Sequence, residues 1–268
     1  MTETFDLEVF IAFAHELADA AKLETLPRFR SPLAVDNKVA ADFDPVTDAD
    51  REAERVIRAL IEDRFPEHGI LGEEHGERLP QAHRRWVLDP VDGTRSFICG
   101  SPTWTTLIAL EADREPLLGV IDQPYVGERW IGTDGRAWLH RHGSVKVIRT
   151  SSCRSLADAR ISTTDPRAAG YFDGDQAALF ARIAAASKLA RFSMDAYAYA
   201  LLASGELDLV IESGLQHYDY AALAPVVRGA GGVITGWGGK AFDAAGGGHT
   251  VAAATPELHA AALEYLNG

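Results

Sequence analysis

The sequence predicts a layered protein of the α/β or α+β class, and three observations lead to this prediction. Segments with helical apolar spacing alternate with short apolar runs bounded by turn residues along all 268 residues. Hydrophobic residues make up 47% of the chain, which is enough for a large buried core. Only two cysteines are present, so the fold does not depend on a disulfide framework, and a reducing compartment is favoured.

The N-terminal part is predicted to hold two amphipathic helices with a loop between them. Apolar residues recur at helical spacing over residues 6–24, which predicts the first helix. Proline and asparagine residues interrupt residues 25–45, which favours a loop. The second helix is expected to begin after Thr47 and to stop at Pro66. Residues 69–80, rich in glycine and glutamate, are expected to be loop.

A group of neighbouring strands is predicted next. The strand-like apolar runs lie at residues 86–88, 104–110, 117–121, 129–132 and 136–140. The last two flank an Asp-Gly dipeptide and resemble a hairpin. We therefore expect an extended sheet in this part of the chain.

The second half is predicted to alternate between strands and helices. Strands are expected near 158–163 and at 188–192, 207–212 and 232–235, and helices at 174–187, 195–204, 219–230 and 256–266. Thr255 and Pro256 suit the N-cap and first position of the last helix. The least regular stretch is 141–157, so we expect one domain, 1–268, with an N-terminal half, 1–145, and a C-terminal half, 146–268.

The charge balance excludes several classes of partner. The chain has 26 Lys and Arg residues against 39 Asp and Glu residues, a net charge of −13. Nucleic acids and anionic membranes bind basic surfaces, so neither is expected as a partner. An anionic substrate remains possible where a metal ion supplies positive charge. No apolar run is long enough for a membrane span, and the start of the chain lacks a signal-peptide pattern, so we expect a cytoplasmic protein.

A compact acidic motif follows the first predicted strand of the sheet. The string DPVDGT, residues 89–94, places Asp89 and Asp92 three residues apart, where both can converge on one point with the carbonyl of Val91. Oxygen ligands of this kind suit a hard cation such as Mg²⁺. An isolated Asp-Gly is usually an ordinary turn, but the whole string together with Glu73 upstream favours a metal site.

Three further carboxylates have a structural and a functional interpretation. Asp219 is placed at the start of a predicted helix, where it can act as an N-cap, as a metal ligand or as both. Asp50 follows Thr47 by three residues, as in a capping box. Asp44 lies outside that helix, so capping does not explain it.

Taken together, these motifs resemble a known family. The segments PVTDAD, LGEE, WVLDPVDGT and YDYAALAPVVRGAGG are similar to those of the inositol monophosphatase family of metal-dependent, lithium-sensitive phosphatases, over about residues 5–265. Within that family the chain most resembles the histidinol-phosphate phosphatase branch, through DPVDGTRSFICGSPTWTTLIAL, the GVIDQP turn and Asp195. The resemblance implies an α+β fold, a five-layer αβαβα sandwich, and a homodimer.

The resemblance also implies roles for the matched positions. Two or three Mg²⁺ ions would be held by Glu73, Asp89, the Val91 carbonyl, Asp92 and Asp219. Glu73, Asp44 and Asp50 would help to hold a further ion or the attacking water, which Thr94 would orient. Substrate contacts would come from Asp92, Gly93, Thr94, Arg95, Asp195, Glu212 and Asp219. The implied reaction is direct in-line attack of water on a small-molecule phosphate monoester. Four carboxylates and two Mg²⁺ ions would form a nearly neutral cluster able to accept that dianion.

Selectivity is expected on the side of the leaving alcohol. Asp195 and Glu212 there favour a cationic alcohol, and L-histidinol phosphate carries an ammonium group and an imidazole. This favours a Mg²⁺-dependent histidinol-phosphate phosphatase of histidine biosynthesis. Asp195 can alternatively cap the predicted helix at 195–204. Ser193 and Met194 replace two glycines typical of the branch, so an inositol-phosphate or broad sugar-phosphate phosphatase stays as an alternative. A non-enzymatic metal-binding scaffold is disfavoured because the matched carboxylates and Thr94 are all present.

Overall fold

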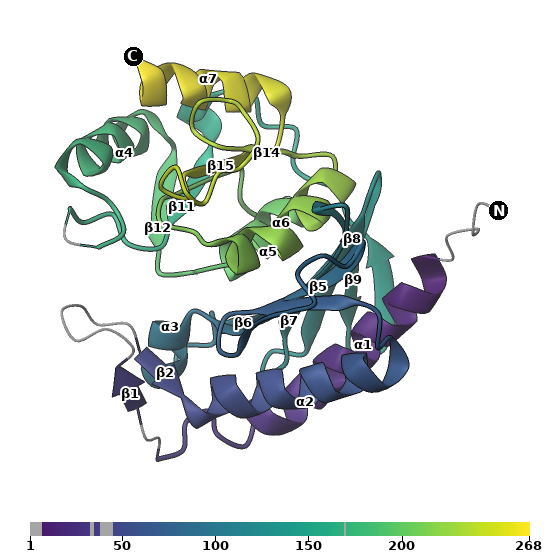
Figure 1. Ribbon diagram of the computed structural model, residues 1–268. Helices are drawn as coiled ribbons and strands as arrows, with labels where there is room; N and C mark the ends of the chain where they lie inside the picture. The colour runs from purple at the N-terminus through teal and green to yellow at the C-terminus, as the bar shows by residue number, and fades with distance from the viewer. Residues whose placement is uncertain (1–6, 33–34, 38–44, 169) are drawn as a thin grey trace.

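The computed structural model describes residues 7–32, 35–37, 45–168 and 170–268. Two β-sheets alternate with three layers of helices, so the αβαβα sandwich of the α+β class is confirmed (Figure 1). Every helix among these residues is too short or too polar to cross a lipid bilayer.

The larger sheet is built from the first half of the chain. Its strands are β3 (Gly69–Gly72), β4 (Gly76–Arg78), β5 (Arg84–Asp92), β6 (Thr105–Ala112), β7 (Glu115–Gln123), β8 (Glu128–Thr133), β9 (Arg136–Arg141) and β10 (Ser144–Val147). They lie in the order β10-β9-β8-β7-β6-β5-β3-β4, and only β3 and β5 run parallel to each other. Helices α1 (Leu7–Thr25) and α2 (Asp48–Arg64) cover the outer face.

The faces of the larger sheet follow from alternation along its strands. In β5, Trp86 and Leu88 pack beneath α1 and α2, whereas Val87 points to the middle layer of helices. That middle layer contains α5 (Tyr197–Ala203) and α6 (His217–Gly229). A Cβ atom at Gly119 would overlap the Ala222 carbonyl of α6, and one at Gly132 would overlap Val226. The two glycines therefore allow α6 to lie directly on the sheet.

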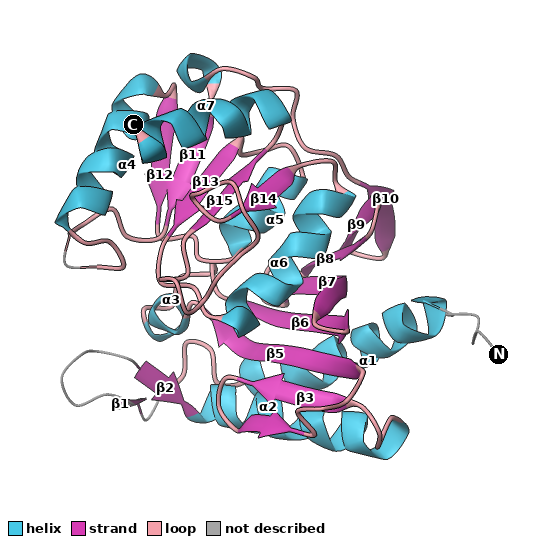
Figure 2. Ribbon diagram, turned by 45° about the horizontal axis from the view of Figure 1, so that its top comes forward, coloured by secondary structure: helices cyan, strands magenta, loops and turns pink. Residues whose placement is uncertain are grey.

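The smaller sheet belongs to the second half of the chain. Its strands are β11 (Arg160–Thr163), β12 (Leu189–Phe192), β13 (Leu209–Glu212), β14 (Val233–Thr235) and β15 (Thr250–Ala253), in the order β12-β11-β13-β15-β14. β11, β12 and β13 are parallel, so their carboxyl ends share one edge. Helices α4 (Gly174–Ala186) and α7 (Pro256–Asn267) cover the outer face (Figure 2). Thr255 caps α7 through the N–H of Leu258, as predicted.

Short elements complete the described chain. They are the two-stranded pair β1 (Val35–Asn37) and β2 (Pro45–Thr47), the helix α3 (Thr94–Ile98) and the 3₁₀ turn η1 (Leu156–Asp158). The expected loop at 69–80 was wrong, because β3 and β4 form there. Their backbone groups are paired with each other and, for β3, with β5, which is a long-range contact that local composition does not reveal.

Candidate active site

A cavity of about 480 Å³ lies between the two sheets. Residues from the carboxyl ends of parallel strands in both sheets line it: Glu73 after β3, Asp89 to Asp92 in β5, Thr164 after β11, Asp195 after β12 and Glu212 in β13. The N-terminus of α6 adds Asp219. Side chains at the carboxyl ends of parallel strands commonly form ligand sites, because loops there can vary without disturbing the sheet.

Three aspartates form the centre of the cavity. Asp89, Asp92 and Asp219 each offer a carboxylate oxygen, and these oxygens all lie within 4.8 Å of one another. The pairing of β5 with β6 shifts between Asp89 and Asp92, which lets both side chains turn to the same side. The Val91 N–H donates to Asp89 Oδ1 at 3.1 Å.

The remaining backbone contacts of this cluster come from the second half of the chain. The N–H of Ala196, just before α5, donates to Asp92 Oδ2 at 2.7 Å. Asp219 is the third residue of α6, and its Oδ2 accepts the N–H of the N-cap residue Gln216 at 2.6 Å. The helix therefore begins at His217 rather than at Asp219, but Asp219 still combines a capping bond with a place in the cluster.

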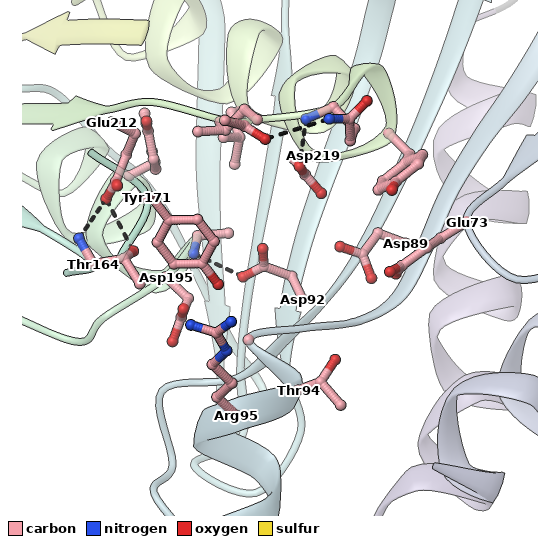
Figure 3. Close-up of a pocket in the computed structure, with 18 of the residues that line it drawn as sticks. Glu73, Asp89, Asp92, Thr94, Arg95, Thr164, Tyr171, Asp195, Glu212 and Asp219 are labelled. Atoms are coloured by element: carbon pink, nitrogen blue, oxygen red, sulfur yellow. Dashed lines mark hydrogen bonds between the residues drawn. The ribbon is translucent and has the colours of Figure 1, made fainter. Parts of the chain in front are cut away.

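Glu73 extends the cluster on the side of the larger sheet. It follows Gly72 in the three-residue loop between β3 and β4, and its side chain lies beside that of Asp89 (Figure 3). Burial raises the pKa of Asp89 well above its usual range, and the charges of Glu73, Asp92 and Asp219 raise it further.

Asp92 is affected in the same way as Asp89. Burial raises its pKa well above the usual range, with further contributions from the charges of Asp195 and Asp219. In the absence of a cation, burial and mutual repulsion therefore disfavour the ionised form of these acids. A converging set of oxygen donors with this unfavourable charge fits a hard divalent cation such as Mg²⁺. Glu73, Asp89, Asp92, Asp219 and the Val91 carbonyl are the residues that could hold it.

Thr94 and Asp50 meet beside this cluster. Thr94 Oγ1 lies 3.1 Å from the Val91 carbonyl and 3.3 Å from Asp50 Oδ1. Asp50 also closes the predicted capping box with Thr47 at the start of α2, so its structural and functional interpretations are compatible. Burial raises the pKa of Asp50 to about 6, against the hydrogen bonds from Thr47, which lower it. Asp44 lies outside the described residues.

Gly93 links the two halves of the cavity. It has a φ of 78°, in the left-handed region that favours glycine, and it is the N-cap of α3. A Cβ atom at Gly93 would lie 2.9 Å from the carboxylate of Asp195. Arg95, in the first turn of α3, stacks over the Tyr171 ring at 5.1 Å and attracts the Asp195 carboxylate.

Asp195 is held by the opposite half of the chain. Its Oδ2 accepts the hydroxyl of Ser96 at 2.7 Å, and its backbone has a φ of 48°. The alternative interpretation, in which Asp195 caps the following helix, was wrong, because α5 begins at Tyr197 after the N-cap Ala196 and no side chain caps it. Burial raises the pKa of Asp195, whereas the Ser96 hydrogen bond and Arg95 lower it.

Glu212 is the other acid on this side of the cavity. Its Oε1 accepts the N–H and the hydroxyl of Thr164 at 2.8 and 3.0 Å, and its Oε2 accepts the Thr163 hydroxyl at 3.3 Å. Burial raises the pKa of Glu212 to about 8, and the charge of Asp195 contributes to this rise.

The sequence did not reveal three other residues of the cavity wall. Thr164 and Tyr171 lie in the segment after β11, and their position at a strand end is the signal that could have identified them. Tyr199 of α5 is buried, and its hydroxyl has no hydrogen-bond partner among the described residues. A buried hydroxyl at a cavity wall usually meets water or a ligand, so this group also indicates a polar occupant.

Known proteins share this architecture. A family model described as the inositol monophosphatase family matches residues 6–267. The bifunctional phosphatase IMPL2, chloroplastic, of Arabidopsis thaliana is 43% identical over 97% of this chain and 76% of that protein. The histidinol-phosphatase of Streptomyces coelicolor is 35% identical over 96% of both chains. A solved inositol monophosphatase from Zymomonas mobilis superposes with a TM-score of 0.86 and 41% identity, covering 98% of this chain and 99% of that one.

Proposed function

The chain belongs to the inositol monophosphatase family and is a metal-dependent phosphomonoesterase, and on this premise we propose that its substrate is L-histidinol phosphate. The products would be L-histidinol and phosphate, in histidine biosynthesis. The observation that carries the proposal is the second pair of acids, Asp195 and Glu212. They lie on the side of the cavity away from Glu73 and Asp89 (Figure 3).

The second pair of acids suits a leaving alcohol that carries positive charge. A phosphate group bound at the metal cluster would place its alcohol between Asp195 and Glu212. A carboxylate has about four acceptor positions. Asp195 accepts one hydrogen bond from Ser96, and Glu212 accepts three from Thr163 and Thr164, so both keep capacity for a donor. The ammonium and imidazole of histidinol are donors of this kind, and charge-assisted bonds to them are strong.

The residues around the metal cluster would perform the hydrolysis. Bound Mg²⁺ would supply the positive charge that the phosphate dianion needs and would lower the pKa of a water molecule. The proton of Thr94 is directed to the Val91 carbonyl and to Asp50, so its oxygen lone pairs can accept a hydrogen bond from the attacking water. Asp50, with a pKa of about 6, is suited to receive a proton through Thr94 near neutral pH.

The phosphate itself would be oriented by the start of α3. The N–H groups of Thr94 and Arg95 precede the first hydrogen bond within this helix, which the N–H of Phe97 makes to Gly93. The Arg95 side chain adds a positive charge at this end of the cavity.

A second candidate substrate is inositol 1-phosphate. The Zymomonas mobilis structure at 41% identity is described as an inositol monophosphatase, and the Arabidopsis relative is described as bifunctional. With a neutral polyol bound, Glu212, whose pKa is raised to about 8, can stay protonated and donate to a hydroxyl group, whereas a bound cation would favour its ionised form. Asp195 is the residue that distinguishes the candidates, because a neutral polyol lacks the positive charge that would pair with its carboxylate.

The test is a direct comparison of phosphate release from the two esters. With Mg²⁺ present, we expect kcat/KM for L-histidinol phosphate to exceed that for inositol 1-phosphate at least about tenfold, which corresponds to roughly one charge-assisted hydrogen bond. EDTA should abolish both activities. A preference for inositol 1-phosphate would reject the histidinol proposal and leave the metal chemistry intact. Release that persists in EDTA would reject the metal chemistry itself.

The proposal extends to assembly and location. We propose a homodimer that acts in the cytoplasm on a small molecule, without nucleic-acid or membrane partners, since the net charge is −13. Light scattering on the purified protein tests the dimer, and a monomer at micromolar concentration would contradict it.

A further inference from the structure

We propose that Glu54, which lies outside the cavity, is a positioning residue for the metal site and acts through Glu73. The inference rests on the proposed metal site. Glu54 is one helical turn beyond Asp50 on α2, and both face the interior because residues four apart share one side of a helix. Its side chain is completely buried. A buried carboxylate is costly unless donors surround it, so its partners indicate its role.

The carboxylate of Glu54 lies beneath the loop that carries Glu73. This loop has three residues, Glu73, Glu74 and His75, between β3 and β4. The N–H of Glu74 donates to Glu54 Oε2 at 2.7 Å, and the N–H of His75 donates to Glu54 Oε1 at 3.1 Å. The N–H of Glu73 donates to the Leu88 carbonyl of β5 at 3.2 Å. All three amides of the loop are therefore fixed, two of them by one side chain.

Arg58 completes this arrangement from the same helix. Its Nε donates to Glu54 Oε1 at 2.7 Å, and a terminal nitrogen donates to the carbonyl of Gly76, the first residue of β4. The guanidinium is nearly buried, with 12% of the side chain exposed, so water weakens this ion pair little. Arg58 thus neutralises Glu54 and holds the far end of the loop.

Gly72 shows that the approach of Glu54 constrains the sequence of the loop. A Cβ atom at Gly72 would overlap the Glu54 carboxylate, although Gly72 lies in regular β3 and has no left-handed backbone. The glycine before Glu73 is therefore required by the close approach of a buried acid.

The consequence is that Glu73 lies beside Asp89 on a loop whose backbone is held in place by hydrogen bonds (Figure 3). Its neighbouring peptide groups are fixed by Glu54, and its side chain lies beside that of Asp89 in the cavity (Figure 3). Groups that orient a metal ligand without touching the metal usually contribute about 10- to 100-fold to metal affinity. We therefore expect Glu54 to affect Mg²⁺ binding through the position of Glu73.

The test is Mg²⁺ binding to Glu54→Gln, measured by isothermal titration calorimetry alongside the wild type. The amide keeps the size of the side chain but presents an N–H₂ group to a loop N–H or to Arg58. We expect the dissociation constant for Mg²⁺ to increase about tenfold or more, and the Mg²⁺ concentration for half-maximal activity to increase in parallel. Glu52→Gln is the matched control on the same helix, since Glu52 is an exposed acid that pairs with Arg55 at the surface, and it should leave both quantities unchanged.

A double-mutant cycle separates positioning from a purely structural role. If Glu54 acts through Glu73, Glu54→Gln should change Mg²⁺ affinity no further in a Glu73→Gln background. Equal losses in both backgrounds would overturn the proposal, as would a Glu54→Gln variant that melts earlier but binds Mg²⁺ like the wild type.

A milder variant covers the case in which Glu54→Gln does not fold. Arg58→Lys keeps the charge but offers a single ammonium group where two hydrogen bonds are made. It should weaken Mg²⁺ binding a few-fold, and unchanged binding would overturn the proposal. A wild-type protein that binds no Mg²⁺ would instead reject the proposed function.

Discussion

The two sides of the cavity are built in opposite ways. On the metal side, Glu73, Asp89, Asp92 and Asp219 repel one another, and burial together with this repulsion raises the pKa of Asp89 and Asp92. On the alcohol side, Glu212 accepts three hydrogen bonds from Thr163 and Thr164, and Asp195 accepts one from Ser96. The metal side therefore carries a repulsion that a bound cation would relieve, whereas the acids of the alcohol side already have donors from the protein.

The largest effect should come from removing one charge on the metal side. Asp89→Asn is expected to reduce phosphatase activity on the order of a thousandfold, because a charged oxygen ligand is lost. The same change should raise the melting temperature of the metal-free protein by several degrees, since it removes a buried repulsive charge. Calorimetry in EDTA and a phosphate-release assay in Mg²⁺ check the two expectations.

Asp122→Asn is the matched control for that experiment. Asp122 is also a buried acid at the end of a strand of the larger sheet, but it lies outside the cavity and accepts a hydrogen bond from Arg129 at 2.7 Å. Its loss should lower the melting temperature and leave the activity per folded molecule nearly unchanged. A lower melting temperature for metal-free Asp89→Asn, as expected for Asp122→Asn, would show that repulsion among the acids does not destabilise the metal side.

The next largest effect should separate substrates on the alcohol side. Asp195→Asn is expected to lower kcat/KM for L-histidinol phosphate about 30-fold, the usual value of a hydrogen bond to a charged group. Turnover of an ester with an uncharged alcohol should change little, because the Ser96 hydrogen bond can persist to the amide oxygen. Steady-state kinetics on both esters provide the measurement, and equal losses would remove Asp195 from recognition.

The smallest effect should appear in the pH dependence of stability. The pKa of Glu212 is raised from 4.5 to about 8, and that of Asp50 from 3.8 to about 6, both first by burial. Between the unfolded and folded pKa values the folded state binds more protons than the unfolded state, so the free energy of unfolding falls as pH rises through this window. The melting temperature in EDTA should therefore fall by a few degrees from pH 5.5 to pH 8.

Saturating Mg²⁺ should reduce the part of the pH dependence that comes from the metal side, where the pKa values of Asp89 and Asp92 are also raised. The cation replaces protons on the metal side and stabilises the ionised acids there. Differential scanning calorimetry across the pH range, with EDTA and with Mg²⁺, gives the comparison. A metal-free melting temperature that rises from pH 5.5 to pH 8 would contradict the assignment of strain to the buried acids.

Part of the metal side could be predicted from local sequence, whereas the places of Glu73 and Asp219 were implied by the family resemblance. Asp89 and Asp92 lie in one short string, and a strand that ends in such a string brings both to one point. The capping box of Thr47 and Asp50 could also be predicted, because it depends on a spacing of three residues at the start of one helix. These features involve contacts between residues close in sequence.

The alcohol side depends on contacts that no local pattern contains. Asp195 and Glu212 were predicted as substrate contacts through the family resemblance rather than from local spacing, and Ser96, the partner of Asp195, is 99 residues away. The central strand β15 was not predicted either, since an alanine-rich segment has little strand propensity and is stabilised by β13 and β14 on its two sides. Tyr171 and Thr164 enter the cavity only because three parallel strands end at the same edge.

The contact between Gly93 and Asp195 has a consequence for how this enzyme could acquire new substrates. The missing side chain of Gly93 leaves room that the Asp195 carboxylate fills, so the turn proposed to bind phosphate and the residue proposed to contact the alcohol are in direct contact. A smaller residue at position 195 would do more than remove a charge, since it would leave a hollow against Gly93 that water or a bulkier alcohol could enter. Evolution or design can therefore broaden the range of accepted esters at one position, while the catalytic string of residues 89–94 stays unchanged.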